Sequence, residues 1–214
     1  MSNTPAEQLV WIDCEMTGLD VENDGLVEIG VIVTDFDLVP LDPGFQLVIN
    51  PGPQALAQMN DSVRNMHETS GLSALIEDGA TLEEAEAQVI AYIDRFVPAG
   101  RRPLVAGNTI GMDRRFITRY MPTLDERLHY RSVDVSTLKE LARRWHPKAF
   151  FNAPDKHGGH RALADIAESI QELAYFRSAS LVESPGPDSK RAGQLSAATV
   201  EQFAALVESA GTPE

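Results

Sequence analysis

The stretch "LVWIDCEMTGLD" at residues 9–20 joins four apolar residues directly to two acids, Asp13 and Glu15, with Cys14 between them. The apolar run is typical of a buried strand, and buried strands seldom end in two carboxylates. Because successive side chains of a strand alternate between its faces, Asp13 and Glu15 point to one side and Cys14 to the other. Two carboxylates this close raise one another's pKa unless a cation lies between them. The stretch therefore predicts either a strand that emerges into solvent or a strand that ends in a cation site.

Strands come first along the sequence, and alternation with helices follows. We expect strands at residues 8–16, 26–35, 44–50, 103–108 and 130–135. We expect helices at residues 81–96, 136–145 and 161–176, and one more through Phe116 and Tyr120. Thr81 and Glu84 form a capping box at the first of these helices, and Ser136 is the expected cap of the second. This order predicts an α/β fold with a mixed five-stranded sheet flanked by helices.

The composition changes after this domain. Residues 183–194 are polar and rich in Pro and Gly, which predicts a linker. Residues 197–209 place Val200, Phe203 and Val207 on one face of a short amphipathic helix. We therefore expect one domain at residues 1–182 and a tail of linker and helix at residues 183–214, which docks either on the domain or on a partner.

Composition also limits the classes of function. The formal net charge of −14 argues against a protein that binds long duplex nucleic acid, which normally needs a basic face. Small anionic substrates remain possible, because exposed charges beyond ~8 Å are largely screened and local metals and arginines decide binding. Cys14 is the only cysteine, and we find neither a signal peptide nor a run of the ~20 apolar residues that a membrane helix needs. We expect a cytoplasmic protein that makes no contact with a membrane.

More acids lie at the ends of other core elements. Asp113 follows the strand at residues 103–108, and Asp165 lies near the start of the last core helix. Taken singly, such acids are more often helix caps or solvated side chains. His160 lies five residues before Asp165, which on a continuous helix means ~140° of rotation, so His160 must precede the helix for the two to meet. The glycines in "HGG" at residues 157–159 permit such a turn.

Four carboxylates from separate elements suit two divalent cations. Mg²⁺ and Mn²⁺ prefer oxygen ligands, and two-metal hydrolysis places the ions ~3.5–4 Å apart. One ion activates the attacking water and the other stabilises the leaving 3′ oxygen, while His160 is the candidate to deprotonate the water. Because Cys14 points to the opposite face of its strand, we do not expect a zinc site.

Three segments together resemble a known family of nucleases. The segments "DCEMTGLD", "GNTIGMDRRF" and "HRALADI" resemble the D-x-E, middle Asp and H-x4-D motifs of the DEDDh 3′-to-5′ exonucleases. Within that superfamily, "HYRSVDVSTLKELARRW" looks like the oligoribonuclease family, and the resemblance covers about residues 8–180. It implies an RNase H-like fold, two Mg²⁺ or Mn²⁺ ions, and release of 5′-mononucleotides from very short single-stranded RNA, dinucleotides above all. It assigns the metal to Asp13, Glu15, Asp113 and Asp165, and the general base to His160.

The resemblance also implies a substrate site and an obligate homodimer. Six residues match the family's substrate contacts: Leu19, His67, Thr109, Tyr130, Arg131 and Ser136. Leu19 matches a wedge between two bases, and His67 a histidine that lines the nucleotide site. Thr109, Arg131 and Ser136 match a cap over the 5′ phosphate, and Tyr130 matches a tyrosine that completes the site of the neighbouring subunit. Where the family often carries a tryptophan before this histidine, the chain has Ser62, so a base-stacking surface is either missing or supplied elsewhere.

Two other functions compete with this interpretation. A DNA proofreading exonuclease shares the D-x-E and H-x4-D chemistry, but "VDVSTLKELARRW" disfavours it. A catalytically inactive binding protein on the same fold predicts the loss of at least one acid, yet all four acids and His160 are present. A short-RNA exonuclease is therefore the leading hypothesis.

Overall fold

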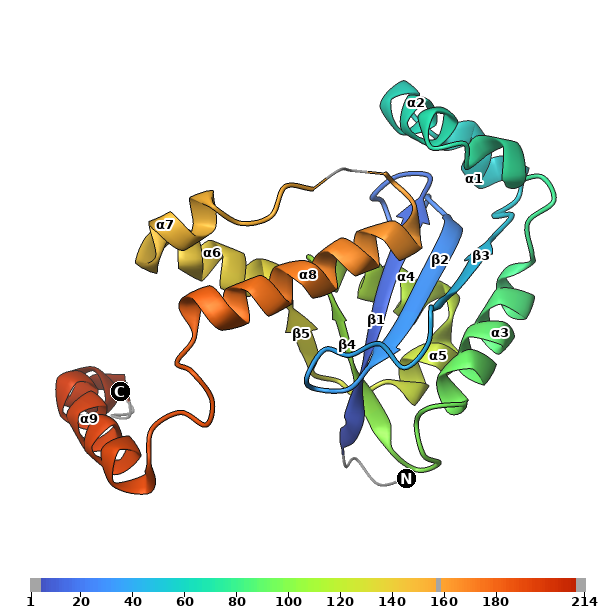
Figure 1. Ribbon diagram of the computed structural model, residues 1–214. Helices are drawn as coiled ribbons and strands as arrows, with labels where there is room; N and C mark the ends of the chain where they lie inside the picture. Colours follow the sequence, from blue (N-terminus) through green and yellow to red (C-terminus); the bar gives the residue numbers. More distant parts are fainter. Residues whose placement is uncertain (1–4, 157–158, 211–214) are drawn as a thin grey trace. The chain divides into compact units, whose positions relative to one another are not determined.

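The structure, a computed structural model, describes residues 5–156 and 159–210. Its centre is a five-stranded sheet with the strand order β3-β2-β1-β4-β5 (Figure 1). The strands are β1 (Pro5–Met16), β2 (Leu26–Thr34), β3 (Phe45–Val48), β4 (Arg102–Gly107) and β5 (Ser132–Asp134). β2 runs antiparallel to both β1 and β3, whereas β1, β4 and β5 are parallel. The expected mixed five-stranded sheet is confirmed.

Helices cover both faces of this sheet. They are α1 (Pro53–Gln58), α2 (Asp61–Thr69), η1 (Ser73–Leu75), α3 (Leu82–Asp94), α4 (Gly111–Tyr120), α5 (Pro122–Arg127), α6 (Val135–Trp145), α7 (Pro147–Phe151) and α8 (Ala162–Ser180). The longer helices α3, α4, α6 and α8 were expected, and the Thr81–Glu84 capping box of α3 is present. The shorter helices were not expected, because segments of three to nine residues show little of a helical period. Three of them, α1, α5 and α7, have a proline near the first helical position, where proline favours the start of a helix.

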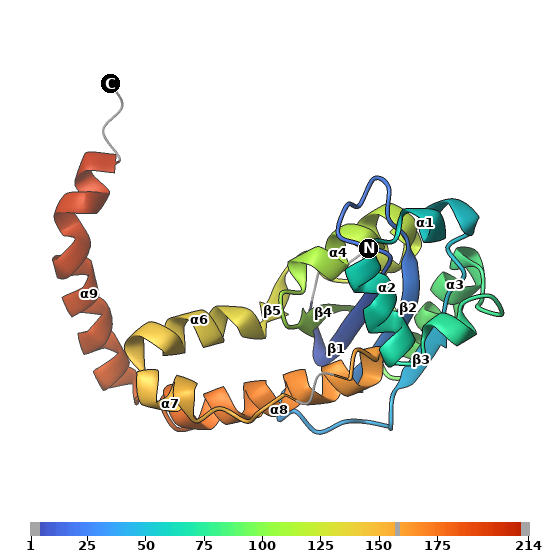
Figure 2. The same ribbon diagram turned by 90° about the horizontal axis from the view of Figure 1, so that it is seen from above.

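The two faces of β1 pack against different helices. Val10, Ile12 and Cys14 belong to the core beneath α3, α4 and α5. Leu9 and Trp11 belong to a second core with residues of α6 and α8. Seen from above, α8 lies along one face of the sheet and α4 along the other (Figure 2). Since alternation continues along the strand, Asp13 and Glu15 lie on the face that α8 covers.

The cap of α6 differs from the expectation. The carboxylate of Asp134, not the hydroxyl of Ser136, caps this helix by accepting the backbone N–H of Ser136 at 2.9 Å. Asp134 has an extended backbone and precedes the first helical residue, Val135, which is the position an N-cap needs. Ser136 is already inside the helix, so its side chain is available for contacts with the β4–α4 connection.

The tail forms a compact unit of its own. Contacts divide the chain into Met1–Ser180 and Leu181–Glu214. The tail helix α9 (Ser189–Ala210) is longer than expected, because Asp188 accepts the N–H of Arg191 and begins the helix within the predicted linker. The linker prediction for residues 189–194 was therefore wrong, and the domain boundary after residue 182 stays a prediction. Among the helices of residues 5–156 and 159–210, we find none with the length and apolarity to span a membrane.

Candidate active site

Three carboxylates meet at the end of β1. Oxygen atoms of Asp13 and Glu15 on β1 and of Asp165 in the first turn of α8 lie within 4.8 Å of one another. The strand supplies the first two by its alternation, and α8 brings the third across the same face of the sheet. The structure thus places the acid of α8 beside the two acids of β1, from which it is far apart in the sequence, as the metal-site hypothesis expects.

The fourth acid reaches this strand end from the opposite helix layer. Asp113 lies in the first turn of α4, is 7% exposed, and accepts the backbone N–H of Cys14 at 3.0 Å. It lies outside the close group of three, but its negative charge contributes to raising the pKa of Asp13. The N–H of Cys14 therefore ties Asp113 to the strand that carries Asp13 and Glu15.

Burial and the mutual repulsion of the carboxylates raise the pKa values of the acids in this cluster. Burial, together with the charges of Asp113, Asp165 and Glu15, raises the pKa of Asp13 to about 9. Burial, with Asp165 and other neighbouring acids, raises the pKa of Glu15 to about 7, and burial raises that of Asp113 to about 7. Holding all of these groups ionised at neutral pH requires positive charge beside them.

The donor set fits hard divalent cations. The cluster offers only carboxylate oxygens, which Mg²⁺ and Mn²⁺ prefer. Cys14 is excluded as a ligand, because its side chain lies in the core on the other face and burial raises the pKa of its thiol. Asp13, Glu15 and Asp165 are the residues placed to hold metal, with Asp113 beside them.

His160 lies beside Asp165 without being part of its helix. α8 begins at Ala162, and His160 has a left-handed backbone with φ of 45° and an exposed side chain. Burial raises the pKa of Asp165, against which the nearby His160 has a lowering effect. The prediction that His160 precedes the helix is confirmed, whereas His157 and Gly158 of the expected glycine turn lie outside the described residues.

Glu28 anchors the start of α8, and sequence reasoning missed it. Its side chain is fully buried and accepts bonds from the Nε of Arg161 at 3.0 Å, the N–H of Ala162 at 2.9 Å and the Nε2 of Gln46 at 2.9 Å. Gly30, two residues along β2, allows the close approach, since a Cβ there would lie 2.7 Å from that of Ala162. The available signal was an acid inside the apolar run "LVEIGVIV", which is tolerated only when it is paired.

We expect Glu28→Ala to lower the free energy of unfolding by about 3 kcal/mol, because it leaves Arg161 and the first N–H of α8 without their buried partner. The measurement is urea unfolding of metal-free protein. Asp37→Ala is the matched control: it removes another arginine–acid pair on α8, with Arg177, but Asp37 is 79% exposed. The control should change stability by less than about 1 kcal/mol. Equal losses in the two variants would contradict the anchoring role of Glu28.

The turn after β1 presents Leu19 to solvent. Leu19 is 67% exposed, although it is apolar. The turn is held by the buried Asp24, which accepts the hydroxyl of Thr17 at 2.8 Å and the N–H of Asp20 at 2.9 Å. Gly18 is required there, because a Cβ would lie 2.3 Å from the Asp24 carboxylate. Asp24, which the sequence did not single out, therefore fixes the position of Leu19.

His67 is buried in α2 beside the cluster. Its Nε2 lies 2.9 Å from the carbonyl of Met16, which makes Nε2 the protonated nitrogen. Its Nδ1 lies 3.9 Å from the carboxylate of Glu15 and has no hydrogen-bond partner in the described part of the chain. A buried acceptor of this kind fits a donor that arrives with a ligand. Ser62, on the same helix, is exposed, and Met59, just before this helix, is buried.

Thr109 and Ser136 lie side by side. Their hydroxyl oxygens are 3.0 Å apart. Thr109 has a left-handed backbone with φ of 55°, held by its N–H, which donates to the Asp134 carboxylate at 2.9 Å. The cap of α6 thus also fixes the β4–α4 connection.

Tyr130 and Arg131 are not brought to these hydroxyls within the chain. Both precede β5, and Arg131 lies three residues before Asp134, or about 10 Å along the strand. Tyr130 is 63% exposed, and its ring stacks on that of His129 with the centroids 4.5 Å apart. The guanidinium carbon of Arg131 lies 5.4 Å from the centroid of the Tyr130 ring. The two residues form an exposed pair at the entry to β5.

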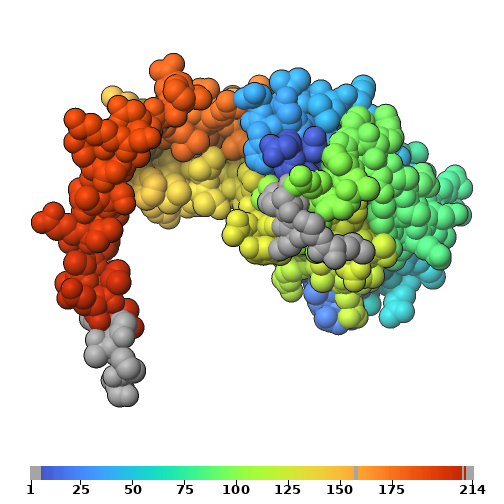
Figure 3. Space-filling model, turned by 90° about the horizontal axis from the view of Figure 1, so that it is seen from below, coloured from blue at the N-terminus to red at the C-terminus, as the bar shows by residue number. Residues whose placement is uncertain are grey.

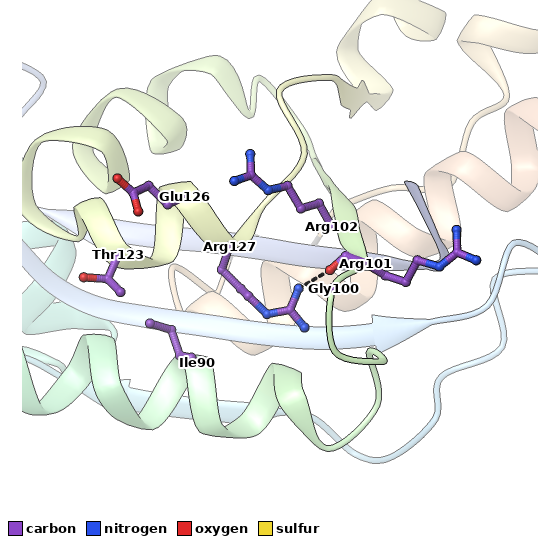
Figure 4. A pocket seen from close by; sticks show the side chains of 7 residues that line it. All are labelled: Ile90, Gly100, Arg101, Arg102, Thr123, Glu126 and Arg127. Carbon is purple, nitrogen blue, oxygen red and sulfur yellow. Dashed lines mark hydrogen bonds between the residues drawn. The ribbon is translucent and has the colours of Figure 1, made fainter. Parts of the chain in front are cut away.

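A cavity of about 200 Å³ lies at the far end of the sheet. Its lining residues are Ile90, Gly100, Arg101, Arg102, Thr123, Glu126 and Arg127, whose charged groups point in different directions (Figure 4). Arg127 donates to the carbonyls of Arg101 and Val97, so the α3–β4 connection lies beside α5 on this lower face (Figure 3). Arg102 pairs with Pro5, eight residues before Asp13, so this cavity is separate from the acidic cluster.

Comparisons with known proteins agree with this geometry. A family model described as "Exonuclease" matches residues 10–173. An exonuclease I structure aligns with a TM-score of 0.62 at 14% identity over 81% of this chain, and one from Methylocaldum szegediense with 0.57 at 21% identity over 81%. The chain spans only about two fifths of those structures, at 42% and 41%. These structures confirm the RNase H-like fold, and the family model, which matches most of the chain, shows that the chain is an exonuclease.

Proteins of similar sequence show to which family of exonucleases the chain belongs. An oligoribonuclease of Leifsonia xyli is 57% identical over 94% of this chain and 98% of the relative. Oligoribonucleases of Cutibacterium acnes and Streptomyces coelicolor are 55% and 52% identical over 88% and 89% of this chain. The chain belongs to the oligoribonuclease family.

Proposed function

We propose that this chain hydrolyses very short single-stranded RNA, dinucleotides above all, and releases 5′-mononucleotides. Its family membership makes it a 3′-to-5′ exoribonuclease of the DEDDh type. The DNA proofreading alternative is not favoured, since the relatives that match nearly the whole chain are named oligoribonucleases. The observation that carries the proposal is the meeting of Asp13, Glu15 and Asp165 within 4.8 Å.

On this proposal the four acids bind the metal ions, and His160 acts as the general base. Asp13, Glu15, Asp113 and Asp165 hold two divalent cations, Mg²⁺ or Mn²⁺. When bound, such ions supply activation of the attacking water and stabilisation of the leaving 3′ oxygen. His160 takes the proton from the water, a role supported by its exposed side chain and its place beside Asp165.

Leu19 and His67 hold the two nucleotides. Leu19 wedges between the bases, which its exposure on a rigid turn supports. The Nδ1 of His67 accepts a hydrogen bond from a ribose hydroxyl, which its lack of a partner in the described residues supports. Such a contact favours a ribose over a group without a hydroxyl at that position.

A cap at the 5′ phosphate sets the substrate length. Thr109 and Ser136 supply hydroxyls, and Arg131 supplies a guanidinium that pairs bidentately with phosphate. A groove closed around a 5′ phosphate excludes longer RNA. A long duplex is not a substrate on this account, in keeping with the net charge of −14.

The enzyme works as a homodimer in which Tyr130 completes the site of the neighbouring subunit. The proposal is supported by an exposed tyrosine that lies apart from the Thr109–Ser136 pair of its own chain. Because the Arg131 guanidinium lies on the Tyr130 ring, the two side chains enter the neighbouring site together. A cytoplasmic location remains part of this proposal, supported by the single buried cysteine.

We expect dinucleotides to be degraded faster than any longer RNA, because the cap has room for two nucleotides only. The measurement compares kcat/KM for 5′-labelled RNAs of two to seven nucleotides, each with Mg²⁺ and with chelator. Dinucleotides should exceed heptanucleotides by at least about tenfold, the effect of one lost charge-assisted contact. Chelator should abolish every rate. Equal or faster cleavage of long single-stranded DNA would contradict the proposed substrate.

A further inference from the structure

Glu172 is a buried carboxylate outside the acidic cluster. It lies on α8, seven residues after Asp165, and is 4% exposed. Its oxygens accept the Nζ of Lys139 at 2.8 Å, the Nζ of Lys156 at 3.2 Å and the Nδ2 of Asn108 at 2.8 Å. These donors come from α6, from the segment before α8 and from the end of β4. One carboxylate therefore ties together three segments that border the proposed substrate site.

Glu172 fixes the orientation of the Asn108 amide. The Nδ2 of Asn108 donates one hydrogen to Glu172 and the other to the Oγ of Ser169, each at 2.8 Å. The hydroxyl of Ser169 donates its one proton to the carbonyl of Asp165 at 2.8 Å, so Ser169 can only accept a hydrogen bond from Asn108. With both acceptors on one side, the amide oxygen of Asn108 must face the other way, where it accepts the hydroxyl of Ser136 at 3.2 Å.

The orientation of Asn108 decides which cap hydroxyl can donate to a ligand. Ser136 has one hydroxyl proton, and that proton is directed to Asn108. In the 3.0 Å contact between Ser136 and Thr109, Thr109 is therefore the donor. The Thr109 proton can turn from Ser136 towards a phosphate oxygen, whereas the Ser136 proton stays on Asn108, so Thr109 is the hydroxyl donor of the cap.

The Glu172 carboxylate also pairs with two positively charged lysines, Lys139 and Lys156. Burial alone would raise the pKa of Glu172, but the bonds from Lys139, Lys156 and Asn108 together hold it below its usual value. The charges of Lys139 and Lys156 together offset that of Glu172 and that of the Asp134 carboxylate, which accepts the N–H groups of Thr109 and Ser136. Without the two lysines, both carboxylates would oppose a doubly charged terminal phosphate at the cap.

We propose that Glu172 is a positioning residue for the 5′-phosphate end of the substrate, acting through Asn108 on Ser136 and Thr109 and through the two lysines. The proposal rests on the proposed cap, because it explains how the cap hydroxyls are oriented. It assigns Glu172 no contact with the reacting atoms.

The test is the ratio of kcat/KM for a 5′-phosphorylated diribonucleotide to that for the same diribonucleotide with a 5′ hydroxyl. Glu172→Gln should lower this ratio about tenfold, the effect of one weakened bond to a charged group. A loss of folded protein lowers both rates equally and leaves the ratio unchanged. Asp42→Asn is the matched control: Asp42 is a carboxylate of similar bonding, to Tyr92, Gly44 and Arg95, that contacts none of the site residues. It should leave the ratio at the wild-type value.

Asn108→Ala provides a second variant that keeps Glu172 and both lysines. It should lower the ratio to a similar extent, and it decides the matter if Glu172→Gln does not fold. The role of Glu172 is overturned if the folded Glu172→Gln and Asn108→Ala variants keep the wild-type ratio while Arg131→Ala lowers it to one. The proposed cap would stand in that case. A wild-type ratio near one would overturn the cap itself, and the role of Glu172 with it.

Discussion

Asp13→Asn should reduce kcat/KM on a dinucleotide by at least about 10³-fold while making the metal-free protein more stable. The loss of activity follows because Asp13 is one of the three acids that meet within 4.8 Å, and losing a proposed metal position would forfeit several kcal/mol of transition-state stabilisation. The gain in stability follows because asparagine removes a carboxyl that burial and three neighbouring acids oppose. An effect of opposite sign on activity and on stability is the signature of a functional cluster.

The stability difference has a defined dependence on pH. Asp13 has a pKa of about 9 in the folded protein and near 3.8 when unfolded, so the folded state binds the extra proton between these values. Stability of the metal-free wild type therefore falls as pH rises from about 4 to about 9, and the advantage of Asp13→Asn grows over the same window. Thermal unfolding in chelator at several pH values measures this. Glu7→Gln, an exposed acid on the same strand, should change neither activity nor the pH slope. A variant that is less stable than wild type at pH 8 in chelator would contradict the account.

Mixed subunits should regain activity if Tyr130 acts across the dimer. Tyr130→Ala and Asp13→Asn should each be inactive as pure proteins. After subunit exchange, half of the dimers are mixed, and each mixed dimer has one site with Asp13 on its own chain and Tyr130 from the partner. The mixture should therefore recover about a quarter of wild-type activity.

A second mixture is the control for this recovery. Asp13 and His160 belong to the same site of one chain in this structure, through Asp165. Asp13→Asn mixed with His160→Ala should therefore stay inactive, since each mixed dimer has one defect in each site. Absence of recovery with Tyr130→Ala, when exchange is confirmed by mass spectrometry of the intact dimer, would refute the shared site.

The central strand could be predicted because its information is local. The alternation of Asp13, Cys14 and Glu15 fixed which side chains share a face, and the structure agrees at every position. The place of His160 before α8 followed from helical geometry, given that His160 and Asp165 share one site. Patterns of this kind depend on backbone periodicity, which neighbours along the chain determine.

The supporting residues could not be predicted because they depend on contacts between distant segments. Glu28 and Glu172 each bond to segments that lie far away in the sequence, whereas Asp24 holds the turn that precedes it. The cap of α6 was misassigned because Asp134 and Ser136 are both good capping residues, and only the backbone conformation at Asp134 decides between them. The apolar run around Glu28 signals that this acid is paired, but nothing along the sequence identifies its partners, Arg161 and Ala162.

The most direct test of the account is an equilibrium titration of the metal-free protein with Mn²⁺ by calorimetry at pH 7, in two buffers of different ionisation enthalpy. Because Asp13, Glu15 and Asp113 have raised pKa values, binding should release protons as well as saturate at two ions per chain. Asp13→Asn should bind fewer ions and release fewer protons. Saturable binding with no proton release, or binding that Asp13→Asn leaves unchanged, would contradict the claim that these acids are held together to bind metal.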